Sequence, residues 1–137
     1  MKKKARGILF IEDKVMLIKR SVNHGIYYVF PGGTVEEGES FEVALVREFN
    51  EELGIRIRPT KMICEILDHT TNTHEVFFES NKESGDIGTG LDHKFSSDSQ
   101  IKEQYELMLV KISTLKDLNI LPSTVKDILL KIYASAS

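Results

Sequence analysis

The segment between Ser40 and Gly54 constrains the fold most, because it is a helix pattern that needs a second layer to cover it. Ser40 is suited to cap the start of a helix, and Gly54 is suited to a left-handed stop after it. Apolar residues recur at helical spacing along one narrow stripe of this segment, Leu45, Phe49 and Leu53. Such a stripe is buried only when the helix lies on another element.

Beside the apolar stripe, the same helix carries acidic residues within an arc of roughly 100°, Glu48, Glu51 and Glu52. Like charges three or four residues apart on a helix repel by about 0.2–0.5 kcal/mol per pair. Arg47 is placed to pair with Glu51, which offsets only part of the repulsion. Two interpretations follow: a solvated acidic surface, or oxygen ligands for Mg²⁺ or Mn²⁺ that waters and substrate phosphates complete.

Runs of β-branched and aromatic residues predict a sheet around this helix. The predicted strands are a largely buried hairpin at 5–20 and single strands at 26–30, 58–69, 73–80 and 105–112. The polar, glycine-rich range 81–100 predicts a long loop, and 123–135 predicts a closing helix. Strands, helix, strands and helix in this order favour an α+β fold, with a sheet covered by helices on its faces.

Composition limits the class of protein. The 137 residues suffice for one domain, and the formal net charge of -3 suggests no general attraction to nucleic acid polymers or to anionic membranes. No uninterrupted apolar run approaches the length of a membrane span. Cys64, the one cysteine, cannot form an internal disulfide. We therefore expect a cytoplasmic protein that is a monomer or a homodimer.

The acidic helix belongs to a longer spacing pattern. In order, the pattern is Gly33, five residues, Glu39, seven residues, Arg47, Glu48, apolar Phe49, one residue, Glu51, Glu52, one residue, Gly54 and apolar Ile55. It resembles the signature of the Nudix hydrolases, the MutT-like family, at every specified position. With average residue usage, the pattern arises by chance in a chain of this length at odds on the order of one in ten million.

The resemblance implies one Nudix hydrolase domain over 1–137, a Nudix-like α-β-α sandwich with a mixed β-sheet. It implies a metal-dependent hydrolase that cleaves the phosphoanhydride of a nucleoside diphosphate derivative, with Mg²⁺ as cofactor and Mn²⁺ as a substitute. The implied metal ligands are the carbonyl of Gly33 and the carboxylates of Glu48, Glu51 and Glu52. Arg47 would orient Glu51, while Glu39 would steady the loop and Gly54 would end the helix.

The general base for the attacking water stays open at this point. Glu48 and Glu52 are candidates within the motif, and Glu103 and Glu106 are candidates ahead of the last predicted strand. The latter two are equally well explained as surface acids. Phosphoryl transfer needs positioning and neutralisation of phosphate charge rather than a covalent nucleophile.

Substrate contacts are expected on the strands before the motif. One of Tyr27 and Tyr28 should face the cleft and stack on a base, and we assign this to Tyr28; Arg20 is placed to meet a phosphate. The proline and tyrosine that mark two Nudix subgroups are absent near 69–73, whereas "FPGG" at 30–33 is shared with members that cleave nucleoside triphosphates. The sequence therefore favours a nucleoside triphosphate, modified or not, cut to monophosphate and diphosphate. The alternatives are an ADP-ribose or nucleotide-sugar pyrophosphatase, and a non-catalytic nucleotide-binding regulator.

Overall fold

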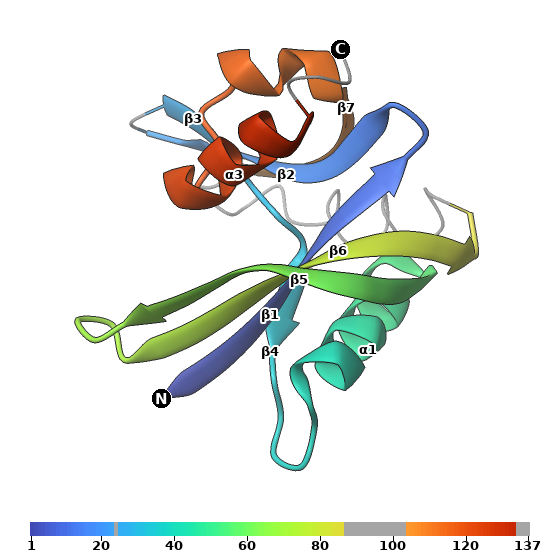
Figure 1. Ribbon diagram of the computed structural model, residues 1–137, viewed down its shortest axis with the longest axis vertical. Helices are drawn as coiled ribbons and strands as arrows, with labels where there is room; N and C mark the ends of the chain where they lie inside the picture. Colours follow the sequence, from blue (N-terminus) through green and yellow to red (C-terminus); the bar gives the residue numbers. More distant parts are fainter. Residues whose placement is uncertain (24, 87–103, 134–137) are drawn as a thin grey trace.

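A computed structural model describes residues 1–23, 25–86 and 104–133 of the chain (Figure 1). Its elements are β1 (Lys2–Ile11), β2 (Lys14–Val22), β3 (Gly25–Val29), β4 (Gly32–Thr34), α1 (Phe41–Leu53), β5 (Arg56–Asp68), β6 (Thr73–Ser84), β7 (Gln104–Lys111), the 3-10 helix η1 (Ile112–Asp117) and α3 (Ser123–Tyr133). The strands form one sheet in the order β3-β2-β1-β6-β5, with β4 paired to β1 and β7 paired to β2.

The sheet is mixed, as predicted. β1 and β6 run parallel over Lys2 to Phe10, and the other paired strands are antiparallel. The predicted hairpin exists, but β1 and β2 pair only at Phe10 with Val15 and at Ile11 with Lys14 before they diverge. β1 then continues between β4 and β6, whereas β2 continues between β3 and β7. β1 therefore joins the two parts of the sheet.

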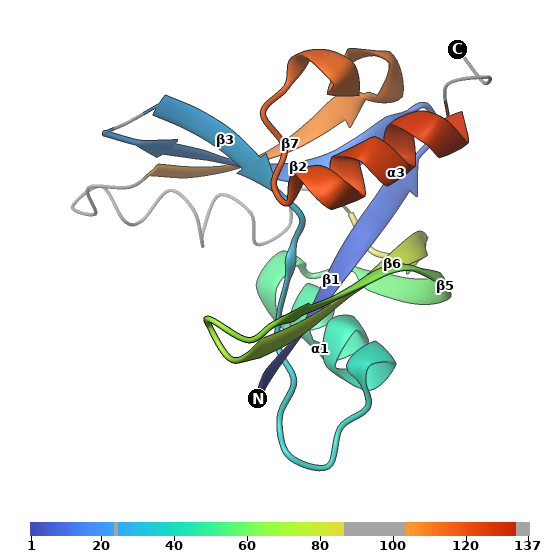
Figure 2. The ribbon, with the colours of Figure 1, turned by 60° about the vertical axis from the view of Figure 1, so that its left-hand side comes forward.

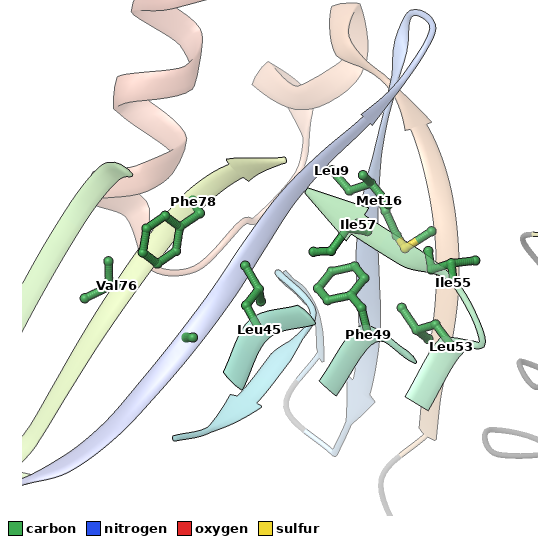
Figure 3. Packing of buried hydrophobic residues seen from close by; sticks show 10 residues of the cluster. Leu9, Met16, Leu45, Phe49, Leu53, Ile55, Ile57, Val76 and Phe78 are labelled. Atoms are coloured by element: carbon green, nitrogen blue, oxygen red, sulfur yellow. The ribbon is translucent and has the colours of Figure 1, made fainter. Parts of the chain in front are cut away.

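Helices cover the two faces of the sheet (Figure 2). On one face, the stripe of α1 packs through Leu45, Phe49 and Leu53 into a cluster with Leu9 and Met16 (Figure 3). Ala5 belongs to the same cluster. On the other face, η1 and α3 close a second cluster, whose buried members are Ile8, Val15, Leu17, Phe30, Phe77, Leu115, Ile120, Val125 and Leu129. Burying an apolar side chain of this size contributes about 1.5–3 kcal/mol. The predicted fold class, a mixed sheet between helices, is confirmed.

Two elements were not predicted, β4 and η1. β4 is short and glycine-rich, and its pairing of Ala5 with Gly33 depends on a strand distant in sequence. Gly32 has a φ of 152°, and a Cβ there would lie 2.0 Å from the carbonyl oxygen of Ala5, so only glycine fits. The loop predicted from 81 is wrong for 81–84, because these polar residues continue β6 and pair with β5; from 87 the predicted loop lies outside the described residues.

Among the helices of the described residues, none has both the length and the apolar character needed to cross a membrane.

Candidate active site

Both ends of α1 are fixed by the residues that the sequence suggested. The Ser40 hydroxyl oxygen accepts a hydrogen bond from the Val43 backbone N–H at 3.1 Å, which caps the first turn. Gly54 has a φ of 69°, and its N–H donates to the Asn50 carbonyl at 3.1 Å. With the apolar stripe buried and the ends capped, the acidic side of α1 has one fixed orientation.

Arg47 anchors α1 to the loop that precedes it. Its Nε donates to Glu39 Oε2 at 2.7 Å and its Nη2 to Glu39 Oε1 at 2.9 Å, a bidentate pair. Nη2 also donates to the Thr34 carbonyl at 3.1 Å, at the end of β4. Glu39 in turn accepts a hydrogen bond from the Glu36 backbone N–H at 2.9 Å. These contacts tie the helix, β4 and the loop between them into one unit.

The remaining terminal nitrogen of Arg47 faces two of the predicted metal ligands. Nη1 donates to Glu48 Oε1 at 3.1 Å and to Glu51 Oε2 at 3.4 Å. The contact that we expected between Arg47 and Glu51 is thus present, but it is longer than the contacts to Glu39 and Glu48. The Glu48 side chain is 15% exposed and that of Glu51 is 58% exposed, so Arg47 orients the inner carboxylate more tightly than the outer one.

The contact between Glu39 and Arg47 also fixes their charges. The hydrogen bonds from Arg47, followed by the one from the Glu36 N–H, lower the pKa of Glu39 from 4.5 to about 2. The same contact with Glu39 raises the pKa of Arg47 further above its already high value. The Glu39 carboxylate is therefore ionised and Arg47 is protonated at neutral pH.

Glu48 lies directly against the backbone of Gly33. A Cβ added at Gly33 would lie 2.4 Å from Cδ of Glu48 and 2.6 Å and 2.7 Å from its two oxygens. The partner of Gly33 on β1 is Ala5, which is buried in the α1 cluster, so this contact lies on the α1 face of the sheet. Any side chain at 33 would push the Glu48 carboxylate away. Because Gly33 has no Cβ, the Glu48 carboxylate can lie in direct contact with the backbone of β4.

These residues fit a hard divalent cation by their chemistry. Within the described residues, no three His, Cys, Asp or Glu side chains converge as a protein-only metal cage would. Mg²⁺ does not require such a cage, because it keeps several waters and takes one or two carboxylates together with substrate phosphates. The ligands available here are all oxygen atoms. Glu48 lies beside Gly33, and the same helix carries Glu51, which is exposed, and Glu52, which is half-buried.

Of the two candidate acids outside the motif, the structure describes only Glu106, which lies away from α1. Glu106 on β7 is exposed and lies opposite Lys19 of β2, on the face of the sheet that α3 covers. Glu103 lies outside the described residues.

Cys64 is half-buried, and burial raises the pKa of its thiol, which disfavours the nucleophilic thiolate.

The two predicted substrate contacts lie on opposite faces of the sheet. Tyr28 packs against the second cluster, on the α3 face. Arg20 lies between Tyr27 of β3 and Tyr105 of β7, with its guanidinium carbon 5.4 Å and 4.5 Å from the two ring centroids. Its Nη2 also donates to the Tyr105 hydroxyl at 2.6 Å. Tyr27 and Tyr28 do alternate across β3, but Arg20 and Tyr28 cannot form one subsite.

Sequence reasoning missed the carbonyl of Thr34 as a partner of Arg47. Every residue has a carbonyl, so no residue type signals this contact. The preference of Arg47 for Glu39 over Glu51 was also missed, although Glu39 was already part of the spacing pattern. Helical spacing favours the pair four residues apart, whereas the folded loop brings closer a residue eight positions away.

Fold and site together define a class of protein: an α+β domain with a mixed sheet, in which an acidic helix is held by the pair of Arg47 with Glu39 and places Glu48 against the backbone of Gly33. The sequence profile of the NUDIX domain family matches residues 1–113 of this chain. That range is most of the 137 residues, so the chain belongs to the Nudix family.

Individual proteins are also similar to this chain in sequence or in fold. An ADP-ribose pyrophosphatase of Methanocaldococcus jannaschii is 47% identical over 51 residues, which are 36% of this chain and 30% of that protein. An E. coli protein, ORF135, superimposes with a TM-score of 0.68 at 20% identity, over 100% of this chain and 91% of the other. An ADP-ribose pyrophosphatase from Streptococcus suis gives a TM-score of 0.63 at 22% identity, over 99% and 92% of the two chains. The two structural matches show a shared fold.

Proposed function

We propose that the chain is a divalent-metal-dependent hydrolase of the phosphoanhydride bond in a nucleoside diphosphate derivative. The observation that carries the proposal is the placement of Glu48 against Gly33, on a helix pinned by the pair between Arg47 and Glu39. Nudix hydrolases generally use divalent metal ions, and the oxygen donors here suit Mg²⁺, with Mn²⁺ as a substitute.

Each motif residue has a distinct part in this proposal. Glu48, Glu51 and Glu52 hold the metal together with the Gly33 carbonyl, and Arg47 keeps the Glu48 carboxylate turned toward Gly33. When bound, the metal neutralises charge on the phosphate oxygens and lowers the pKa of water.

The proton of the attacking water goes to Glu48 or Glu52. The position of Glu106 on the opposite face of the sheet favours a base within the motif. Glu103 stays a candidate on sequence grounds alone.

The substrate is a nucleoside triphosphate, cut to monophosphate and diphosphate. The "FPGG" stretch at 30–33 supports this choice, and Tyr28 supplies a ring for the base on the α3 face. Arg20 stays a predicted phosphate contact, although its observed partners include Tyr27 and Tyr105.

Hydrolysis of ADP-ribose or of a nucleotide sugar is the second candidate. The names of two similar proteins, both ADP-ribose pyrophosphatases, favour it. The matched stretch spans only 30% of each curated relative, so their activities carry over here only as proposals. A non-catalytic nucleotide-binding regulator is a third candidate. The presence of Glu48, Glu51 and Glu52 together disfavours it, because a binding module does not need all of these ligands.

The test is a panel of nucleoside triphosphates, ADP-ribose and nucleotide sugars with Mg²⁺ or Mn²⁺, read out as released phosphate and diphosphate. Phosphorus NMR in ¹⁸O-labelled water then locates the cut from the labelled fragment. Glu52→Gln should keep the fold and lose turnover by several orders of magnitude, because a ligand charge is lost while repulsion along the helix falls.

Glu42→Gln is the matched control, since Glu42 is an exposed acid in the first turn of the same helix. It should keep full activity. Normal turnover in Glu52→Gln at saturating Mg²⁺, or no hydrolysis of any compound in the panel, would refute the proposed function.

A further inference from the structure

Arg6 on β1 and Glu75 on β6 form an ion pair that the site described above does not use. Arg6 Nε lies 2.8 Å from Glu75 Oε2, and the two side chains are 24% and 25% exposed. Within the described residues, the two terminal nitrogens of Arg6 make no hydrogen bond. Neither of these nitrogens is among the buried side-chain atoms that lack a partner, so both keep contact with solvent. Glu75 therefore holds the guanidinium at Nε and leaves its two terminal nitrogens accessible.

Stability does not explain this pair. Ion pairs that keep partial contact with solvent contribute about 0–1 kcal/mol, and deeper burial adds a desolvation penalty. On the same face, Arg6 lies between Lys4 and Ile8 of β1 and opposite Phe77 of β6, and Ile8 and Phe77 are buried. An apolar side chain at position 6 would pack there at least as well. A cation at this place is better explained by a ligand.

The pair lies close to the metal site in the strand register. Arg6 is opposite Gly32, one position from the pairing of Ala5 with Gly33. Successive residues of one strand are about 3.4 Å apart along the strand, and paired residues of two strands are about 5 Å apart. The backbones of Arg6 and Gly33 are therefore roughly 6 Å apart. The side chains project to opposite faces, since Glu48 meets Gly33 on the α1 face and Arg6 shares the α3 face with Phe77.

A substrate can reach both faces at β4. Among the described strands, β4 pairs with β1 alone, so no second strand covers its outer edge. A compound whose diphosphate lies at Glu48 must pass around this edge to reach the α3 face. The nucleoside or sugar attached to the diphosphate is the part that would extend there. Tyr28 lies on the same face as Arg6.

From this geometry we infer that Arg6 binds the part of the substrate that the metal does not hold, and that Glu75 positions Arg6 for this task. The inference rests on the proposed function. A guanidinium offers donors only, in a planar fork, so the terminal nitrogens of Arg6 select a group with two adjacent oxygen or nitrogen acceptors. A terminal phosphate and the acceptor edge of a guanine-type base both present such a pair.

The test compares Arg6→Met, Arg6→Lys and Glu75→Gln with the wild type on GTP, ATP, ADP-ribose and UDP-glucose. Arg6→Met should raise KM about tenfold with kcat within about twofold, because binding is lost without loss of the chemical step. Arg6→Lys restores charge without the fork and should recover only part of the loss. Glu75→Gln should fall between the wild type and Arg6→Met.

Arg56→Met is the matched control, because Arg56 forms an exposed ion pair with Glu83 at 3.4 Å on the neighbouring strands. It should leave KM unchanged. An effect confined to GTP relative to ATP identifies the base as the ligand. An equal effect on both triphosphates but not on UDP-glucose identifies the terminal phosphate. Unchanged KM in Arg6→Met for all four compounds, or the same rise in Arg56→Met, overturns the inference.

Calorimetry separates this inference from the proposed function. Binding of methylene-bridged analogues of GTP and ATP, which resist hydrolysis, is measured with Mg²⁺ in the wild type and in Arg6→Met, so no turnover is needed and the metal ligands stay intact. Binding that weakens about tenfold without Arg6, in a chain whose wild type hydrolyses nothing, supports Arg6 while the hydrolase proposal fails. Equal binding in the two proteins, or no binding in the wild type, overturns the role of Arg6.

Discussion

Gly33→Ala should damage the site and spare the fold. The added Cβ would lie 2.4 Å from Cδ of Glu48, where carbon atoms in ordinary contact are about 3.5 Å apart. The Glu48 carboxylate must therefore retreat by about 1 Å. Gly33 is not among the residues with positive φ, so alanine is compatible with its backbone. Because the clash is with the end of a side chain, Glu48 can rotate and leave the strands in place.

The expected loss of activity follows from that displacement. A misplacement of about 1 Å in a reacting group costs roughly 100-fold in rate. The unfolding free energy of Gly33→Ala should stay within about 1 kcal/mol of the wild type, as for a substitution without backbone strain. The measurements are kcat/KM on the best compound of the panel at saturating Mg²⁺ and the thermal unfolding midpoint.

Gly32→Ala gives the contrasting control. Its Cβ would meet the carbonyl oxygen of Ala5 at 2.0 Å, and its φ of 152° is strained for alanine, so the pairing of β4 with β1 should fail. Gly33→Ala should thus lose activity while it stays folded, whereas Gly32→Ala should lose stability. Wild-type activity in a folded Gly33→Ala protein would refute the argument that Glu48 must lie against Gly33.

Two further predictions concern stability. The pKa of Glu39 is about 2 in the folded protein against an ordinary 4.5, so its pair with Arg47 stabilises fully above pH 4.5 and is lost as pH falls through 2. Acid titration of the unfolding midpoint should therefore show less pH dependence in Glu39→Gln between these values, and identical profiles would count against the pair. Phe49→Ala removes a ring that is 1% exposed in the α1 cluster and should cost about 3–5 kcal/mol in urea unfolding. A cost below 1 kcal/mol would mean that α1 does not pack there.

The helix α1 was predictable because its determinants are local. Ser40, the stripe of Leu45, Phe49 and Leu53, and Gly54 follow one another within a single segment, and each acts on its near neighbours. Strand positions were predictable for the same reason, from runs of β-branched and aromatic residues. The positions of both strands in the first hairpin were right, and so was the location of the turn between them.

Contacts between distant segments could not be predicted in this way. The parallel pairing of β1 with β6 and the pairing of β4 with β1 depend on the whole sheet. The ion pair of Arg6 with Glu75 joins residues 69 positions apart, and nothing in the sequence near either one announces the other. The opposite faces of Arg20 and Tyr28 follow from strand alternation once the strands are placed, but the sequence alone did not fix which face meets α1.

Manganese titration tests the central claim most directly, namely that the carboxylates of α1 hold a divalent cation against a diphosphate. Mn²⁺ binding is followed by electron paramagnetic resonance in the wild type, Glu48→Gln and Glu42→Gln, with and without a methylene-bridged nucleoside triphosphate analogue that resists hydrolysis. We predict that the wild type and Glu42→Gln bind Mn²⁺ more tightly when the analogue is present, and that Glu48→Gln loses this gain. Equal Mn²⁺ affinity in all three proteins, unaffected by the analogue, would contradict the account.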